Sequence, residues 1–423
     1  MRRRAFLLLG PLALAGCGGP GGYYPSGGYG AGYGNGGPIG LSPGQPLPGA
    51  ASRNARVAIL APITGPRADL GQALVQAAQL AMAEPGSPML DVKDTGGTPQ
   101  GAAAAAQAAI GEGAGLIIGP LMSTETAAVA PVARGANVAV LAFTNDPSQA
   151  QPGVWTLGIT PGQQVRRLVA AVQAQGRTQI AALLPDNDFG HVMGQALMQA
   201  ATSNGLPPPN IRYHSAGMGS INAAARDLSG YANRRGPIDA QIKEARALGT
   251  PEGRRQAQDL AKSAIPPPNF SALLLADTGE ALAEVASMLP YYDVDRSQVQ
   301  ILGPSLWASP SSGSGQESGA WYAAPDPAAR AGLEQSYAAK YGGPPPAVAD
   351  LAFDAASIAR VLGASGGFSI AALTQPAGFI GADGWLALQP DGQVRRGLAV
   401  FRVQRGGPEM IEPAPQSAEG TGS

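Results

Sequence analysis

The sequence predicts an α/β protein with two doubly wound parallel-sheet lobes. From Arg56 onward, short apolar runs alternate with Ala-rich amphipathic stretches, and the same rhythm restarts after Thr160. Alternating strands and helices are typical of parallel sheets that carry helices on both faces. The length of 423 residues also suggests more than one domain.

The first unit opens with an apolar strand at 57–60 and a helix at 69–84. Apolar residues recur at a helical spacing between Leu70 and Ala81 of that helix. The same criteria predict strands at 89–93, 115–118 and 138–143 and helices at 101–110 and 124–134. In the second unit they predict helices at 163–175 and 191–203 and strands at 180–184, 211–213, 272–275, 300–302 and 320–323.

One segment of the second unit differs in charge from the rest of the chain. Residues 226–262 contain 8 Lys/Arg and 5 Asp/Glu, whereas charged residues make up 13% of the whole chain. We predict two helices here, at 237–247 and 251–264, the second with Thr250 as its N-cap and Pro251 at its first position. The segment 226–264 is therefore a charged helical insertion. It is either a solvated face or a docking surface for an acidic partner.

Composition excludes several kinds of function. A net charge of -1 argues against nucleic-acid binding, which needs a concentrated excess of Lys and Arg. Two histidines, His191 and His214, and one cysteine, Cys17, cannot build a zinc site of the usual Cys/His type or an intrachain disulfide. Neither histidine belongs to a recognisable nucleophile elbow. We therefore expect no enzyme activity, no cofactor and no metal.

The N-terminus has the features of an export signal. Three arginines and a short apolar run predict a signal peptide at 1–16, too short to span a bilayer permanently. The sequence Leu-Ala-Gly before Cys17 resembles the bacterial lipobox, which implies that Cys17 is lipidated. The alternative is an ordinary secretion signal with an incidental cysteine. Gly18 stands where that lipoprotein family has Asp for inner-membrane retention, which implies an outer-membrane anchor that faces the periplasm.

Two segments lack the composition of a folded domain. Residues 18–52 contain 14 Gly, 6 Pro and 4 Tyr and no charged residue, so with Cys17 they predict a lipidated, disordered tether at 17–52. The tether is either a passive spacer or uses its tyrosines to contact cell-wall material. The tail at 406–423 is also predicted to be disordered.

Several strand-end motifs together resemble the type I periplasmic binding protein family, in particular its leucine/isoleucine/valine receptors. They are VAILAPITGP at 57–66, GPLMST at 119–124, VLAFTN at 140–145, DNDFG at 186–190 and FIG at 379–381. The resemblance covers roughly 55–405 and implies two lobes joined by hinge crossovers. It implies lobe 1 at 55–157 with 326–368, and lobe 2 at 158–325 with 369–405.

The strand-end loops of this fold form a ligand site, since ligands bind beyond the carboxyl ends of parallel strands and helix N-termini favour anions. Ser123 and Thr124 either hold a carboxylate or act as helix caps, and Thr144 either completes that anion pocket or is a turn residue. Leu70 and Phe189 occupy positions where the family places aromatic rings, with core packing as the alternative. The candidate ligand-binding residues are Leu70, Leu121, Ser123, Thr124, Ala142, Thr144, Thr160, Phe189, Asp277 and Ser305.

The second lobe departs from the amino-acid receptors, which clamp an ammonium group with acidic side chains. The matching positions here hold Thr160 and Ser305. Asp277 is the one carboxylate at a second-lobe strand end that could substitute, unless it lies in a surface turn. An unpaired buried ammonium would cost several kcal/mol, so a free amino acid fits this site poorly.

A lipobox, a long tether and a weak amino-acid clamp together resemble the penicillin-binding protein activators. Those are outer-membrane lipoproteins whose type I domain contacts a peptidoglycan synthase. The resemblance therefore implies a regulator of peptidoglycan synthesis with a synthase as its partner. The alternative is a receptor of an ABC transporter that delivers branched-chain amino acids or related small carboxylates to a permease.

Overall fold

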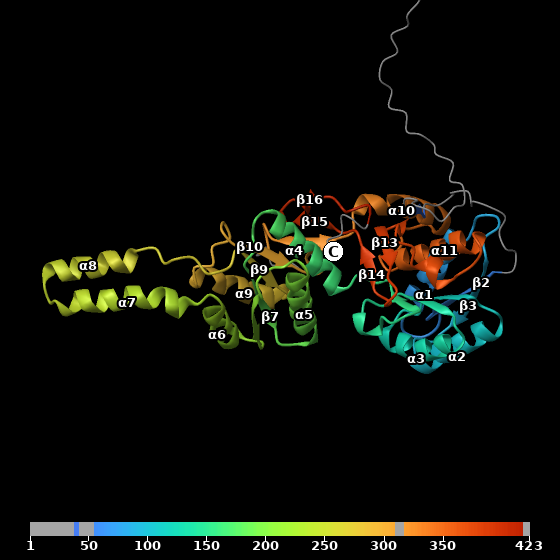
Figure 1. Ribbon diagram of the computed structural model, residues 1–423, viewed down its shortest axis with the longest axis horizontal. Coiled ribbons are helices and arrows are strands. Elements are labelled where there is room, and N and C mark those ends of the chain that lie inside the picture. The colour runs from blue at the N-terminus through green and yellow to red at the C-terminus, as the bar shows by residue number, and fades with distance from the viewer. Residues whose placement is uncertain (1–37, 42–54, 309–316, 418–423) are drawn as a thin grey trace, which may run out of the picture.

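A computed structural model describes residues 38–41, 55–308 and 317–417. The predicted signal peptide, Cys17 and most of the predicted tether lie outside these residues. The described part forms two α/β lobes, and a helical hairpin projects from the second lobe on the side away from the first (Figure 1). The α/β prediction is confirmed. Among the described residues, no helix is long and apolar enough to cross a membrane.

The first lobe contains a parallel sheet of five strands in the order β3-β2-β4-β5-β6. Its strands are β2 (Arg56–Ala61), β3 (Met89–Asp94), β4 (Leu116–Ile118), β5 (Ala139–Ala142) and β6 (Val154–Thr156). Its helices are α1 (Ala68–Ala81), α2 (Pro99–Gly111), α3 (Ser123–Gly135), α10 (Pro327–Tyr341) and α11 (Ala349–Ala364), with a short η1 (Pro147–Gln149) after β5. Helices α1 and α11 pack together over one face of the sheet, and α2 and α3 pack over the other.

A second, smaller sheet completes the first lobe and changes the predicted lobe division. It consists of β1 (Ile39–Gly40), β12 (Phe379–Gly381), β13 (Gly384–Leu388) and β14 (Val394–Arg396), preceded by α12 (Ile370–Leu373). Phe379, Leu386 and Val394 share one hydrophobic core with β2 and α11. The structure therefore divides the segment 369–405, which was predicted to belong to lobe 2 as a whole.

Residues 38–41 also depart from the predicted disorder of the tether. Ile39 and Gly40 pair with β12 as a parallel edge strand, and Leu41 is buried in the first-lobe core. Ile39 and Leu41 are apolar residues in a Gly/Pro-rich stretch, so they can add hydrophobic surface to an open sheet edge.

The second lobe is built on a seven-stranded sheet in the order β16-β15-β11-β10-β9-β7-β8. Its strands are β7 (Ile180–Pro185), β8 (Asn210–His214), β9 (Ala272–Leu275), β10 (Gln300–Gly303), β11 (Trp321–Ala324), β15 (Ala399–Arg402) and β16 (Glu409–Glu412). Its helices are α4 (Pro161–Ala174), α5 (Asp188–Ser203), α6 (Met218–Leu228) and α9 (Gly279–Tyr291), with η2 (Ser305–Ala308) after β10. The first five strands in chain order are parallel, and β15 and β16 add antiparallel.

The strand β16 corrects the prediction that 406–423 is disordered throughout. Glu409–Glu412 pairs with β15, and Arg167 of α4 forms an ion pair of 2.9 Å with Glu412. The composition of this tail did not predict the strand, because it shows neither the pairing with β15 nor the packing of Ile411 against the second-lobe core.

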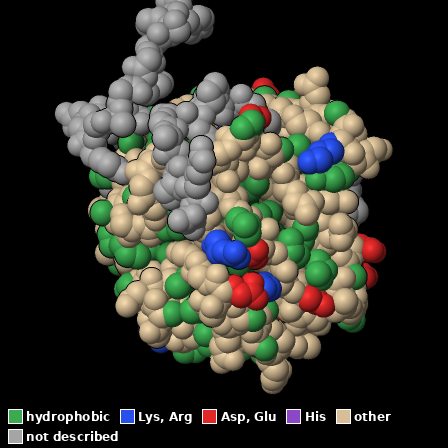
Figure 2. All heavy atoms as spheres, turned by 90° about the vertical axis from the view of Figure 1, so that its right-hand side faces the viewer, with side chains coloured by type: hydrophobic (Ala, Val, Ile, Leu, Met, Phe, Trp, Pro, Cys, Tyr) green, Lys and Arg blue, Asp and Glu red, His purple; other side chains and the backbone are tan. Residues whose placement is uncertain are grey.

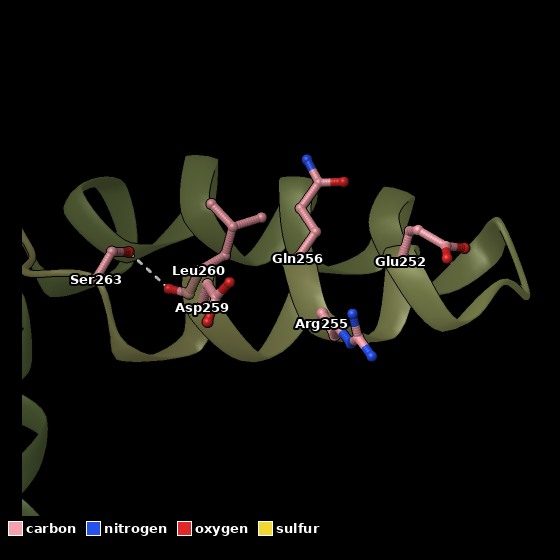
Figure 3. Close-up of a pocket in the computed structure, with 6 residues that line it drawn as sticks. All are labelled: Glu252, Arg255, Gln256, Asp259, Leu260 and Ser263. Atoms are coloured by element: carbon pink, nitrogen blue, oxygen red, sulfur yellow. Dashed lines mark hydrogen bonds between the residues drawn. The ribbon is translucent and has the colours of Figure 1, made fainter.

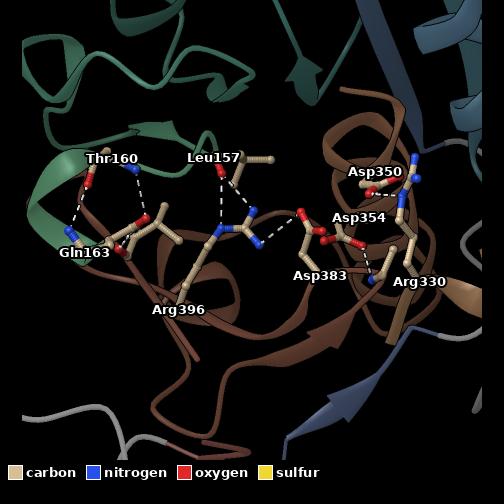
Figure 4. A network of polar contacts seen from close by, with 10 residues as sticks. Leu157, Thr160, Gln163, Arg330, Asp350, Asp354, Asp383 and Arg396 are labelled. Carbon is tan, nitrogen blue, oxygen red and sulfur yellow. Dashed lines mark hydrogen bonds and ion pairs between the residues drawn. The ribbon is translucent and has the colours of Figure 1, made fainter. Parts of the chain in front are cut away.

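The chain passes between the lobes three times, at 157–160, 325–326 and 397–398. Each passage joins an element of one core to an element of the other: β6 to α4, β11 to α10, and β14 to β15. These are the expected hinge crossovers. They lie close to the buried polar residues described below (Figure 4).

The charged insertion is an antiparallel hairpin of α7 (Tyr231–Ala247) and α8 (Pro251–Lys262). The prediction of two helices is confirmed, although α7 begins six residues earlier than expected and contains Pro237 in its interior. The hairpin has a small apolar core of its own, formed by Ile238, Ile242, Ala245, Ala257 and Leu260.

Candidate functional site

The first-lobe residues predicted to bind ligand lie in or beside the loops that follow β2, β4 and β5. Leu121 and Thr144 are in these loops, whereas the other four are in the adjoining elements: Leu70 in α1, Ser123 and Thr124 in α3, and Ala142 at the end of β5. Gly71 allows α1 to lie directly on the first of these loops, because a Cβ at this position would stand 2.1 Å from the carbonyl oxygen of Pro62. Leu70 is 38% exposed and Leu121 is half-buried, so both are accessible. Ala142 is fully buried in the core between β5 and α3, and a ligand cannot reach it without rearrangement.

Asp146 contacts two residues that were predicted to hold a carboxylate. Its backbone N–H donates to Thr144 Oγ1 at 3.1 Å, and its carboxylate accepts a hydrogen bond from the Ser123 side chain. Partial burial by itself raises the pKa of Asp146, but hydrogen bonds from Ser148, Gln149 and Ser123 outweigh it and hold the pKa below its usual value. The predicted anion pocket thus contains an ionised carboxylate of the protein itself.

The N-terminus of α3 is also satisfied from within the chain. Glu125 is fully buried, and its Oε2 accepts a hydrogen bond of 3.0 Å from the backbone N–H of Met122, the residue before α3. Thr124 is exposed beside it. An acidic side chain at this position already complements the positive end of the helix dipole, so a bound carboxylate would meet like charge.

In the second lobe, Thr160 and Ser305 serve the protein's own backbone. Thr160 is the N-cap of α4 and exchanges two hydrogen bonds with Gln163, at 3.0 and 3.3 Å (Figure 4). Gln163 in turn donates to the carbonyl of Val394 at 2.6 Å. The Ser305 backbone N–H donates to Gln164 Oε1 at 2.8 Å. Both residues therefore lie where α4 meets its neighbours.

Asp277 forms a buried pair with His214. Its Oδ2 lies 3.2 Å from His214 Nε2, and each side chain is 3% exposed. Trp307 Nε1 donates to the Asp277 carbonyl at 2.9 Å. Burial by itself lowers the pKa of His214, but the hydrogen bond and the charge of Asp277 outweigh burial, so the net pKa lies above the usual value. The surface-turn alternative for Asp277 is wrong, because the residue is buried.

Phe189 lies half-buried at the start of α5 and packs against the second-lobe core. Gly190 lets this helix start close to the end of β7, since a Cβ there would stand 1.9 Å from the carbonyl oxygen of Pro185. Nearby, His191 Nε2 lies 2.9 Å from Asp186 Oδ1. Both histidines thus have aspartate partners, and no group of three or more His, Cys, Asp or Glu among the described residues could hold a metal ion.

A buried charge network at the hinge was not predicted from the sequence. Arg396 donates from Nε and Nη2 to the Leu157 carbonyl, at 3.2 and 2.7 Å, and so ties β14 to the first crossover (Figure 4). Its Nη1 lies 3.8 Å from Asp383 Oδ2. Asp354 of α11 is fully buried, and its Oδ1 accepts a hydrogen bond of 2.6 Å from the Ala382 N–H.

The same network continues to the second passage of the chain, at 325–326. Arg330, near the start of α10, forms a 2.5 Å ion pair with Asp350. Burial raises the pKa of Asp350 to about 7 and that of Asp354 to about 8, and the nearby charge of Asp383 adds to both shifts. Three carboxyl groups face two arginines here, so protonation of one carboxyl balances the buried charge. Asp350 and Asp354 stand four residues apart in an apolar helix, which was the available sequence signal.

The fold agrees with the comparisons to known proteins. A family model described as periplasmic binding protein matches residues 54–408. The chain belongs to the periplasmic binding protein family. Members of this family are binding proteins or receptors, and the family name implies a periplasmic location. No curated protein sequence matches the chain.

Solved structures show the same fold at low identity. A putative branched-chain amino acid ABC transporter protein from Rhodospirillum rubrum has a TM-score of 0.62 at 19% identity, covering 85% of this chain and 100% of that one. Full-length LpoA from Haemophilus influenzae has a TM-score of 0.59 at 16% identity, over 86% of this chain but 60% of LpoA. The LpoA C-domain, described as a regulator of PBP1A, has a TM-score of 0.57 at 18% identity, over 84% of this chain and all of that domain.

Proposed function

We propose that this protein is a periplasmic lipoprotein that activates a peptidoglycan synthase, and that its family's solute site has lost the charged groups of an amino-acid receptor. Cys17 carries the lipid and holds the protein to the outer membrane. Solved structures of this fold include both transporter receptors and LpoA, so the fold alone does not choose between them. The residues at the strand ends favour the synthase activator over the transporter receptor.

The state of Asp277 is the observation that carries the proposal. A free amino acid needs a carboxylate for its ammonium group, because burial of an unpaired ammonium costs several kcal/mol. Asp277 is the second-lobe candidate, and it is already paired with His214 in a site that is almost closed to solvent. Thr160 and Ser305 supply no charge in its place.

The first lobe supports the same conclusion for the other end of an amino acid. Ser123 and Thr144 are bonded to Asp146, and Glu125 caps the helix whose N-terminus would receive a carboxylate. A carboxylate ligand would have to displace these contacts and would approach two acidic side chains. This arrangement also disfavours the alternative receptor for small carboxylates.

A polymerisation assay tests the proposal. The soluble chain from residue 18 onward is added to the peptidoglycan synthase of the same organism, and the rate of glycan-strand synthesis from lipid II is measured. We expect the rate to rise several-fold and the two proteins to form a complex in a pull-down. An unchanged rate together with no complex would contradict activation.

A ligand screen tests the alternative in parallel. A receptor at a ligand concentration 100 times its Kd would be stabilised by about 2.7 kcal/mol, which a thermal-shift assay detects easily. We expect no shift with amino acids or small carboxylates. A clear shift that disappears in the double variant Ser123→Ala/Thr144→Ala would favour the receptor instead.

A further inference from the structure

The hairpin of α7 and α8 stands apart from both lobe cores. Its apolar residues pack on each other, and its helices contact the body mainly through α6 (Figure 1). A hairpin of this kind adds little to the stability of the lobes, since most helix stability comes from packing on a core. It lies at the end of the second lobe far from the hinge.

Two residues near the start of α7 fix the base of the hairpin to the body: Tyr231 packs against the second-lobe core and contacts the Tyr292 ring edge-on, and Arg234 forms hydrogen bonds. Arg234 donates to the carbonyls of Ser229, Pro266 and Tyr292, at 2.9, 2.6 and 2.7 Å. Ser229 precedes α7 and Pro266 follows α8, so this guanidinium joins the entry and the exit of the hairpin to the end of α9. The hairpin is thus held in one direction, and a rigid element loses little entropy when it binds a partner.

Charge is distributed unequally between the hairpin and the rest of the protein. Residues 231–262 hold 7 Lys/Arg and 4 Asp/Glu, a net charge of +3. The remainder of the chain from Cys17 holds 18 Lys/Arg and 25 Asp/Glu, a net charge of -7. The opposite end of the molecule shows few charged side chains of either sign (Figure 2). The hairpin is therefore the basic part of an acidic protein.

The tip of the hairpin combines an apolar residue with arginines. Leu248, between the helices, is 63% exposed, and Gly253 allows the helices to approach there because a Cβ would stand 2.4 Å from the Ala245 carbonyl oxygen. Arg254 and Arg255 are exposed on the first turns of α8, and neither forms an ion pair with another described residue. A shallow pocket runs along α8 from the tip towards the base of the hairpin (Figure 3), lined by Glu252, Arg255, Gln256, Asp259, Leu260 and Ser263.

We propose that the tip of this hairpin is the docking element for the synthase, and that it binds an acidic protein surface with an apolar depression at its centre. Leu248 enters the depression, and Arg254 and Arg255 pair with carboxylates at its rim. An apolar centre with a charged rim is the usual anatomy of a protein interface, and arginine is enriched in its energetically important positions. This inference rests on the proposed function and specifies the surface that performs it.

Two matched charge reversals test the inference. The docking variant is Arg254→Glu/Arg255→Glu, and the control is Arg134→Glu/Arg405→Glu, which changes exposed arginines of the body by the same total charge. Glutamate is tolerated near a helix N-terminus, so α8 remains folded, and circular dichroism verifies this. Binding of the soluble full chain to the cognate synthase is measured by biolayer interferometry at 50 and 300 mM NaCl.

We expect the docking variant to bind at least 10-fold more weakly than the wild type, and the control to bind within about 2-fold of it. Higher salt should weaken the wild type more than the docking variant. A second variant, Leu248→Ser, should weaken binding without changing the salt dependence.

Equal binding of wild type and docking variant would overturn the hairpin as the docking element and leave activation intact. Absence of any binding by the wild type would overturn both. Sedimentation of the chain alone tests a second copy as the occupant: a dimer that dissociates in the docking variant would also contradict docking to the synthase.

Discussion

Replacement of Asp354 by asparagine should reduce the pH dependence of stability near neutral pH. The Asp354 side chain is fully buried, accepts a hydrogen bond from Ala382 and has a second oxygen without a partner among the described residues. Burial raises its pKa to about 8, so the folded protein holds a proton there at pH 7. Asparagine has nearly the same shape and stays neutral at every pH.

The sign and size of the effect follow from proton linkage. The unfolded chain has the ordinary aspartate pKa of 3.8, so between pH 4 and 8 only the folded state binds this proton. Stability contributed by this group is complete below pH 4 and falls as pH rises, by at most about 1.4 kcal/mol per pH unit. From pH 5 to 8 the wild type should lose up to about 4 kcal/mol. Because Asp350 shares the network, we expect the free energy of unfolding of Asp354→Asn, relative to the wild type, to rise by about 2–4 kcal/mol from pH 5 to 8.

Urea denaturation followed by circular dichroism at pH 5, 6, 7 and 8 measures this difference. The stability of Asp354→Asn relative to the wild type should increase steadily with pH. Asp391→Asn is the matched control, because Asp391 lies in the exposed turn between β13 and β14 of the same small sheet. Parallel pH profiles for the wild type and Asp354→Asn would refute the argument that this carboxyl is protonated in the folded protein.

Three further predictions test other parts of the structure. Asp277→Asn should destabilise the protein by about 2–3 kcal/mol at pH 6 and by less at pH 9. The raised pKa of His214 stabilises the folded state fully below pH 6.5, and this contribution is lost as pH rises through the folded-state pKa. Urea denaturation at both pH values measures the loss of stability. Gly190→Ala should cost about 1–3 kcal/mol by its clash with backbone and lower the Tm, whereas Gly111→Ala, which meets open space, should leave the Tm unchanged or raise it. Cys17→Ser should move the protein from the membrane fraction to the soluble fraction on cell fractionation, and a protein that stays with the membranes would argue against a lipid anchor.

Hydrophobic periodicity predicted well those elements whose own residues carry a clear apolar pattern. Strands β2 and β7 are buried on both faces, so they appear as apolar runs, and their predicted bounds differ from the observed ones by one residue at each end or less. Helix α11 was not predicted because it is buried along its entire length and therefore lacks the exposed polar face of an amphipathic surface helix. Strand β6 has three residues, which is too short for a period to appear.

The candidate site was predictable only in part, for a similar reason. The sequence indicates which loops follow strand ends, but the bonding partners of their side chains come from distant segments. His214 and Asp277 are 63 residues apart, and Arg396 and Leu157 are 239 apart. Only the folded topology brings these groups together, so the sequence could not show that Asp277 already has a partner.

The contacts at the hinge and the projecting hairpin both favour a docking role for this fold over a solute-binding role. A solute receptor closes its lobes over a ligand, so its strand-end residues must be free to change partners as the hinge moves. Here Arg396 and Gln163 join β14 to the first crossover and the helix that follows it. Arg330 joins the start of α10 to α11 beside the second crossover. Of these contacts, the hydrogen bond from Gln163 of α4 to the Val394 carbonyl of β14 joins the two lobes, and it contributes about 0.5–1.5 kcal/mol against any hinge motion that would separate them. A two-lobed body that resists such motion is a suitable base for a projecting arm, because docking requires a fixed direction of the hairpin and not closure of the lobes.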